Sequence, residues 1–146
     1  MSVVTGLQKY AGEAIRQRGS SPKLQVLNTA LMTAPSGLAL REARLDHEVW
    51  GRLVESAVGA HLANAAAQGV CDLFYWRDRS REVDFVARAG RRLTAIEVSS
   101  ARSRAAQPGI AAFASTFRVH RTLLVGGDGI PLEEFLARPV EHWVRE

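Results

Sequence analysis

Three acidic residues, Glu55, Asp84 and Glu97, have surroundings typical of a site for a divalent cation. Asp84 lies in the alternating run Glu82–Val86 and Glu97 lies near the end of Leu93–Val98, and such alternation predicts two short strands. Strands that each deliver a carboxylate could hold Mg²⁺, or Mn²⁺ in its place, because hard cations prefer carboxylate and carbonyl oxygens. Glu55 lies in a run with helical spacing, where either a ligand or an exposed surface glutamate fits.

The same acids could instead form ion pairs with nearby arginines. Residues 77–104 contain eight arginines and four acidic residues, an excess of four that equals the net charge of +4 of the whole chain. A basic rim would attract a nucleic-acid backbone around an acidic centre. The candidates for this binding are Arg77, Arg79, Arg102 and Arg104. An arginine-rich solvated surface explains the same pattern without a ligand.

The composition predicts a single globular domain. The chain has 146 residues, of which 47% are hydrophobic and 23% are charged, and these values exclude a wholly disordered chain. The apolar runs are far shorter than the ~20 residues that cross a bilayer, so we expect no membrane partner. The first residues lack a signal-peptide pattern, and the single cysteine, Cys71, excludes an internal disulfide. We therefore expect a cytoplasmic protein.

Hydrophobic spacing and turn residues predict an α/β (α+β) domain. Expected helices cover residues 6–19, 29–33, 46–68, 107–117 and 131–137, and expected strands cover residues 23–28, 72–76, 82–88, 92–98 and 122–125. The three middle strands are separated by tight turns and so predict an antiparallel meander. The core order is therefore α-β-β-β-α-β, a mixed sheet with helices on both faces.

Five short pieces of the chain carry a resemblance to a known family. They are, in order, Ser20–Leu24, Trp50–Glu55, Phe74–Arg77, Glu82–Val86 and Ile96–Val98. From about Tyr10 onward the chain resembles the domain that follows the ATPase module in a large family of prokaryotic AAA+-like ATPases, and through it the PD-(D/E)XK nuclease-like fold. The resemblance implies a Mg²⁺-dependent endonuclease site. In that site Asp84 and Glu97 would hold the metal with a backbone carbonyl, here that of Val98, and Glu55 would join directly or through water.

One departure from the family concerns the catalytic lysine. Family members commonly have lysine two residues after the second strand acid, where this chain has Ser99. Serine cannot supply a positive charge, and loss of one such electrostatic contact costs on the order of 10²–10³ in rate. Arg77, Arg102 or Arg104 could replace the lysine, although arginine is a poor general base. The site residues that the resemblance implies are therefore Glu55, Asp84, Glu97 and the degenerate position Ser99.

A second departure is the missing ATPase module. The chain contains no Gly-x-x-x-x-Gly-Lys-Ser/Thr loop, so we expect no ATP site of that type. We expect residues 1–22 to be an N-terminal helix and linker left from the junction to the missing module, and residues 23–146 to be the restriction-endonuclease-like domain.

Three functions remain open. The first is a catalytically degenerate nuclease fold that serves as a nucleic-acid-binding or oligomerisation module of an ATPase-type system. The second is an active Mg²⁺-dependent nuclease that uses a relocated cationic residue. The third is a protein-interaction domain with no role in nucleic acid. The expected partners are accordingly nucleic acid, an ATPase module or a second copy of the chain.

Overall fold

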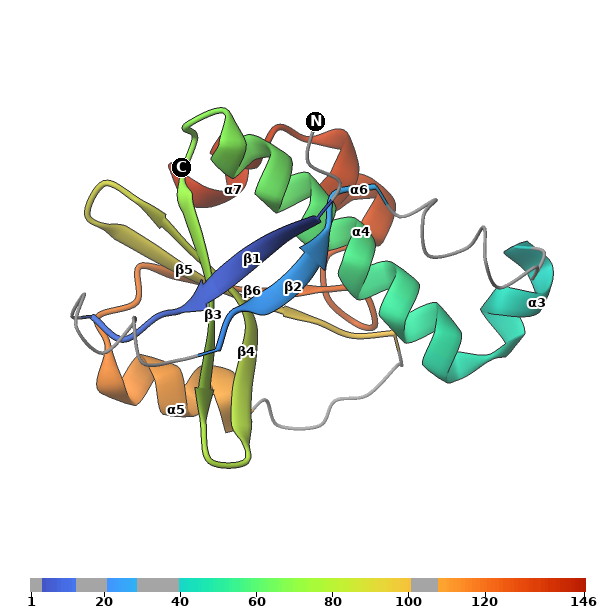
Figure 1. Ribbon diagram of the computed structural model, residues 1–146, viewed down its shortest axis with the longest axis horizontal. Coiled ribbons are helices and arrows are strands. Elements are labelled where there is room, and N and C mark those ends of the chain that lie inside the picture. The colour runs from blue at the N-terminus through green and yellow to red at the C-terminus, as the bar shows by residue number, and fades with distance from the viewer. Residues whose placement is uncertain (1–3, 13–20, 29–39, 101–107) are drawn as a thin grey trace.

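One mixed β-sheet organises the protein, as the computed structural model in Figure 1 shows. The structure describes residues 4–12, 21–28, 40–100 and 108–146. The strands are β1 (Val4–Lys9), β2 (Lys23–Val26), β3 (Asp72–Asp78), β4 (Arg81–Ala89), β5 (Arg92–Val98) and β6 (Arg121–Val125). The helices in the described ranges are α3 (Leu40–Leu45), α4 (His47–Ala67), α5 (Pro108–Thr116), α6 (Leu132–Ala137) and α7 (Val140–Val144).

The strand order across the sheet is β2-β1-β3-β4-β5-β6. Strands β3, β4 and β5 form the antiparallel meander that the sequence predicts. Strand β6 returns after α5 and pairs with β5 in parallel, with Ile96 opposite Leu123. At the other edge, β1 pairs in parallel with β3 and antiparallel with β2. The mixed α+β sheet expected from the sequence is therefore present.

Helices cover both faces of the sheet. On one face α4, α6 and α7 contribute to a core that includes Val58, Leu62, Phe85, Ile96, Phe135 and Trp143. On the other face α5 packs Phe113 against a second core that includes Val83, Val86, Leu93 and Ala95. Figure 1 shows α5 on the side of the sheet away from α4, α6 and α7. Two cores separated by one sheet follow from strands that bury apolar residues in both directions.

The predicted helix over residues 6–19 is wrong for residues 6–9, which belong to strand β1. Leu7 and Tyr10 have a spacing that fits a helix, but the backbone of this segment pairs with β3 instead. Lys9 lies opposite Tyr75, and the Tyr10 N–H donates to the Tyr75 carbonyl at 2.7 Å. Residues assigned to an N-terminal linker thus belong to the sheet. Residues 13–20, and the predicted helix over residues 29–33, lie outside the described residues.

Helix α4 begins and ends where its sequence predicts. The Asp46 carboxylate accepts hydrogen bonds from the N–H groups of Glu48 and Val49, at 3.0 and 3.1 Å, which caps the helix. Gly69 follows the helix with a φ of 82°, a conformation that favours glycine.

The short helices α3 and α7 were not predicted. Neither α4 nor any other described helix is long and apolar enough to cross a membrane.

A bulge in β4 decides which way the acids point. Phe74 and Trp76 of β3 lie opposite Val86 and Val83 of β4, so three steps on β4 match two steps on β3. The extra residue breaks the alternation: Val83 and Val86 pack in the second core, whereas Phe85 packs in the first. Bulges commonly redirect a side chain at a sheet edge or site. Here the bulge brings Asp84 toward the side of the sheet that α4 covers.

Candidate functional site

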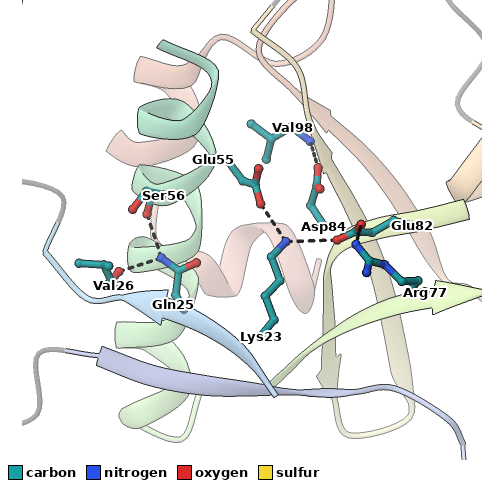
Figure 2. A network of polar contacts seen from close by, with 9 residues as sticks. All are labelled: Lys23, Gln25, Val26, Glu55, Ser56, Arg77, Glu82, Asp84 and Val98. Carbon is teal, nitrogen blue, oxygen red and sulfur yellow. Dashed lines mark hydrogen bonds and ion pairs between the residues drawn. The ribbon is translucent and has the colours of Figure 1, made fainter. Parts of the chain in front are cut away.

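A lysine lies at the centre of the acidic residues. Figure 2 shows Lys23 pointing from β2 into the space between α4 and β4. Its Nζ lies 2.8 Å from Glu55 Oε1 and 3.4 Å from Glu82 Oε1. Glu82 also accepts a hydrogen bond from Arg77 at 2.7 Å. We refer to Lys23, Glu55, Glu82 and Asp84 as the Lys23 cluster.

The contacts within the Lys23 cluster favour the charged forms of Lys23 and Glu82. Burial opposes the charge on Lys23, but the hydrogen bond and charge of Glu55, with the charges of Asp84 and Glu82, outweigh it, so the pKa of Lys23 is raised. Burial also disfavours the charge on Glu82, yet Arg77 and Lys23 together lower the pKa of that carboxyl. Lys23 therefore stays an ammonium ion, and Glu82 stays a carboxylate, at neutral pH.

Asp84 is the most deeply placed acid of the Lys23 cluster. Its Oδ2 accepts a hydrogen bond from the Val98 N–H at 2.9 Å. The backbone pairing of β4 with β5 ends at Phe85 and Ile96. Beyond this pair, the Asp84 side chain accepts the hydrogen bond from the Val98 N–H. Burial raises the pKa of Asp84 to about 6, the bond from Val98 opposes this rise, and the charge of Glu55 adds to it.

Glu97 points to a different neighbour, the start of α5. It accepts a hydrogen bond from the backbone N–H of Ile110, which lowers its pKa, but burial first and the charge of Asp84 second leave the pKa of Glu97 raised. A Cβ added to Gly109 would lie 2.8 Å from Glu97 Oε1 and would overlap the carbonyl of Glu82. Glycine at this position lets α5 approach β4 and β5 closely, and the helix N-terminus favours the negative charge of Glu97.

The three predicted metal ligands are near one another but have separate partners. Glu55 is paired with Lys23, Asp84 with the Val98 N–H, and Glu97 with the Ile110 N–H. Within the described ranges, no group of three or more His, Cys, Asp or Glu side chains is arranged to hold a metal ion. The metal site therefore stays a prediction.

Lys23 was not among the site residues predicted from the sequence. It appears in the quoted piece Ser20–Leu24, but only arginines were considered as substitutes for the missing lysine. A usable signal was its rarity, because Lys9 and Lys23 are the only lysines among 19 basic residues. Its Nζ also lies 5.6 Å from the centre of the Phe85 ring, so the aromatic side chain of β4 helps to hold the ammonium group.

Of the four arginines predicted to bind nucleic acid, only one is seen to contact the Lys23 cluster in the described residues. Arg77 reaches the Lys23 cluster through Glu82. Arg79 is exposed in the turn between β3 and β4, with a φ of 55°. Arg102 and Arg104 lie outside the described residues. At the degenerate lysine position, the Ser99 N–H donates to the Val125 carbonyl at 2.8 Å, which continues the pairing of β5 with β6.

A family comparison covers the segment that contains these acids. A family model described as a domain of unknown function, DUF4143, matches residues 50–130, more than half of the chain. The chain belongs to the DUF4143 family. Domains of the DUF4143 family occur in proteins associated with AAA-type ATPases. The match includes Glu55, Glu82, Asp84 and Glu97 but not Lys23. No curated protein and no solved structure gave a significant match.

Proposed function

We propose that this DUF4143 domain has a nuclease-like fold that has lost catalysis and serves as a nucleic-acid-binding module of an ATPase-type system. The observation that carries the proposal is the placement of Lys23, whose Nζ lies 2.8 Å from Glu55 and 3.4 Å from Glu82. A fixed ammonium group supplies positive charge to acids that a divalent cation would otherwise neutralise. This charge supports a role that does not rely on the metal on which phosphodiester hydrolysis would depend.

The order of the elements supports the nuclease-like part of this proposal. The run α4-β3-β4-β5-α5-β6 has the order expected of that core, and its acids come from α4, β4 and β5. Ser99 in place of lysine supports the loss of catalysis, since serine cannot stabilise the charge that develops on a phosphate.

The basic surface supports nucleic acid as the partner. Arg79 and Arg81 are exposed at the turn that joins β3 to β4, next to the strand segment that carries Glu82. If these groups bind phosphates, the affinity for a DNA duplex should fall steeply with salt, by roughly one power of salt for each phosphate neutralised. Fluorescence anisotropy over a chloride series measures this slope. Absence of binding at low salt would favour the protein-interaction function.

Divalent-cation binding by a Lys23→Gln variant tests the central observation. Removing the ammonium leaves Glu55 and Glu82 without their shared cation, so we expect Mn²⁺ to bind the variant about tenfold more tightly than the original protein, as a change of one unit charge near two carboxylates implies. Isothermal titration of both proteins with Mn²⁺ gives the two affinities. Lys23→Arg is the matched control, because it keeps the charge and should keep Mn²⁺ affinity low.

An active Mg²⁺-dependent nuclease is the second candidate, with Lys23 as the relocated cation. It is favoured by Asp84, whose pKa burial raises to about 6 and which feels the opposing charges of Glu55 and Lys23. In that case the original protein would bind Mn²⁺ and cleave DNA, and both Lys23→Gln and Asp84→Asn would abolish cleavage. We expect instead that the original protein cleaves DNA no faster than Asp84→Asn does.

A further inference from the structure

A basic cavity lies at the opposite end of β5 from Glu97. It has a volume of about 600 Å³ and is lined by Arg91, Arg118, Val119 and His120. Arg91 lies in the turn between β4 and β5, and the other three residues lie between α5 and β6. Two segments far apart in the sequence thus meet around one hollow, and neither belongs to the Lys23 cluster.

The sheet holds both segments of this cavity in place. The His120 N–H donates to the Leu93 carbonyl at 2.8 Å, and Arg121 lies opposite Thr94 where β6 begins to pair with β5. On the other segment, Gly90 has a φ of 61° that permits the tight turn before Arg91. Backbone pairing therefore holds the described residues on both sides of the cavity.

Among the residues that the structure describes, no acid compensates the charges that line the cavity. Neither Arg91 nor Arg118 is within ion-pair distance of a carboxylate in the described part of the chain, and no acidic residue described there lines the cavity. Other arginines do have such partners, for example Arg88 with Asp72 at 2.9 Å. Arg91 and Arg118 are both exposed, so both guanidinium groups are accessible to an anion that enters the hollow.

We infer that this cavity binds a phosphate group. Guanidinium groups match a phosphate because their N–H donors form paired hydrogen bonds with its oxygens, and His120 adds a third donor when its ring presents an N–H. The volume lies in the range of pockets that hold a small organic ligand, so a sugar or base attached to the phosphate also fits. The site does not depend on the chemistry of the Lys23 cluster.

The phosphate has two sources, a nucleic-acid strand or a small phosphorylated molecule. Along β5 the seven residues of Arg92–Val98 extend ~20 Å, at about 3.3 Å per residue. That length equals roughly six base pairs of duplex, at about 3.4 Å per phosphate along one strand. A nucleic acid that ran along β5 from this cavity would be long enough to reach the Lys23 cluster, whereas a nucleotide would not.

Amide-resolved NMR titration of ¹⁵N-labelled protein tests the inference with three probes. They are inorganic phosphate, adenosine monophosphate and a 12-base-pair DNA duplex, each at constant ionic strength in chloride. We expect saturable shifts at the amides of Arg91, Val119 and His120. Arg91→Gln and Arg118→Gln should each weaken phosphate binding about tenfold, as loss of a charge-assisted hydrogen bond implies. The control is Arg41→Gln, which removes an exposed arginine from α3 and should leave affinity within about twofold.

The probes separate the two sources and allow the inference to fail. Shifts with all three probes, tightest for the duplex, support a nucleic-acid strand, and shifts with phosphate and the nucleotide alone support a small phosphorylated ligand. Absence of saturable shifts at these amides with every probe overturns the inference, as does equal weakening by Arg41→Gln. If a variant fails to fold, the positions of the shifts in the original protein still decide. The result of the Mn²⁺ titration of Lys23→Gln does not depend on this cavity. The phosphate site and the proposed function can therefore fail separately.

Discussion

The charge of Asp84 costs the folded protein stability at neutral pH. Its pKa rises from 3.8 in an unperturbed chain to about 6 in the fold, so the unfolded chain loses this proton at a lower pH than the folded protein does. Stability therefore falls as the pH rises from about 4 to 6 and stays lower above that window. Asp84→Asn removes the charge but keeps an oxygen that can accept from the Val98 N–H. We expect this variant to be more stable by up to about 3 kcal/mol at pH 7.5, measured by urea unfolding, and to lose that advantage near pH 4.

The matched control for Asp84→Asn is Asp72→Asn. Asp72 pairs with Arg88 on the surface, where its side chain is 63% exposed, and exposed pairs contribute about 1 kcal/mol or less. Asp72→Asn should change stability little at either pH. A clear loss of stability in Asp84→Asn at pH 7.5 would mean that the ionised carboxylate supports the fold. Asp84 would then be a structural ion-pair partner rather than an acid retained at a cost.

Which single residues can be found from sequence depends on how local their signal is. Asp84 and Glu97 are recognisable because each interrupts an apolar strand. Lys23 is separated from Glu55 by 32 positions and from Glu82 by 59, and no local pattern records that β2 lies beside α4. The acids could therefore be found from the sequence, but their partners could be found only from the fold.

At the scale of an element, two glycines of α4 allow a matched comparison. Gly51 and Gly59 each lie one turn from Glu55. A Cβ on Gly59 would overlap the buried side chain of Gln25 and lie 2.7 Å from Phe85 Cζ. Among the described residues, one on Gly51 would meet only the Ser100 side chain, with Oγ at 3.0 Å. Gly59→Ala should lower the free energy of unfolding by about 1–3 kcal/mol through overpacking. Gly51→Ala should raise it by up to about 1 kcal/mol, because alanine favours a helix and exposed Ser100 can rotate away.

Thermal and urea unfolding of both glycine variants measures the difference. If Gly59→Ala is as stable as Gly51→Ala, then Gln25 can leave its place without cost. That outcome would contradict the tight packing of β2 against α4, in which the Gln25 side chain donates to the carbonyls of Val26 and Ser56 at 2.7 and 3.2 Å.

The elements predicted correctly are those whose signal is complete within a few residues. Strands β3, β4 and β5 have alternating apolar and polar residues and are separated by turns. Helix α4 has a capping residue, Asp46, at its start and a glycine, Gly69, just after its end. Two features were not predictable in this way. Segment Val4–Lys9 buries Leu7, but its strand structure depends on the distant Tyr75. The bulge in β4 depends on its register with β3. Strict alternation along β4 would instead place Asp84 and Phe85 on opposite sides of the sheet.

At the scale of the whole molecule, the sheet is unevenly held together. Strands β4 and β5 contribute buried residues to both cores. In contrast, β1 joins β3 through the pairs Gln8–Phe74 and Lys9–Tyr75, with one further backbone bond from Tyr10. Figure 1 shows β1 and β2 side by side, with β2 next to α4. Strand β2 therefore places Lys23 among the acidic residues, although β1 and β2 are attached to the sheet more weakly than the central strands are.

This arrangement predicts that β1 and β2 open before the rest of the sheet. Hydrogen exchange followed by mass spectrometry should show faster exchange in peptides covering residues 4–9 and 23–26 than in those covering residues 81–98, because local opening is easiest where few buried contacts hold a unit. Glu55→Gln weakens the tie to Lys23 and should speed exchange over residues 23–26 by up to about fivefold, the effect of a partly exposed ion pair, without changing residues 81–98. Glu48→Gln breaks the exposed pair with Arg52 on the same helix and should change neither. Equal exchange across all six strands would mean that the sheet opens as one unit, and that Lys23 leaves the acids only when the whole protein unfolds.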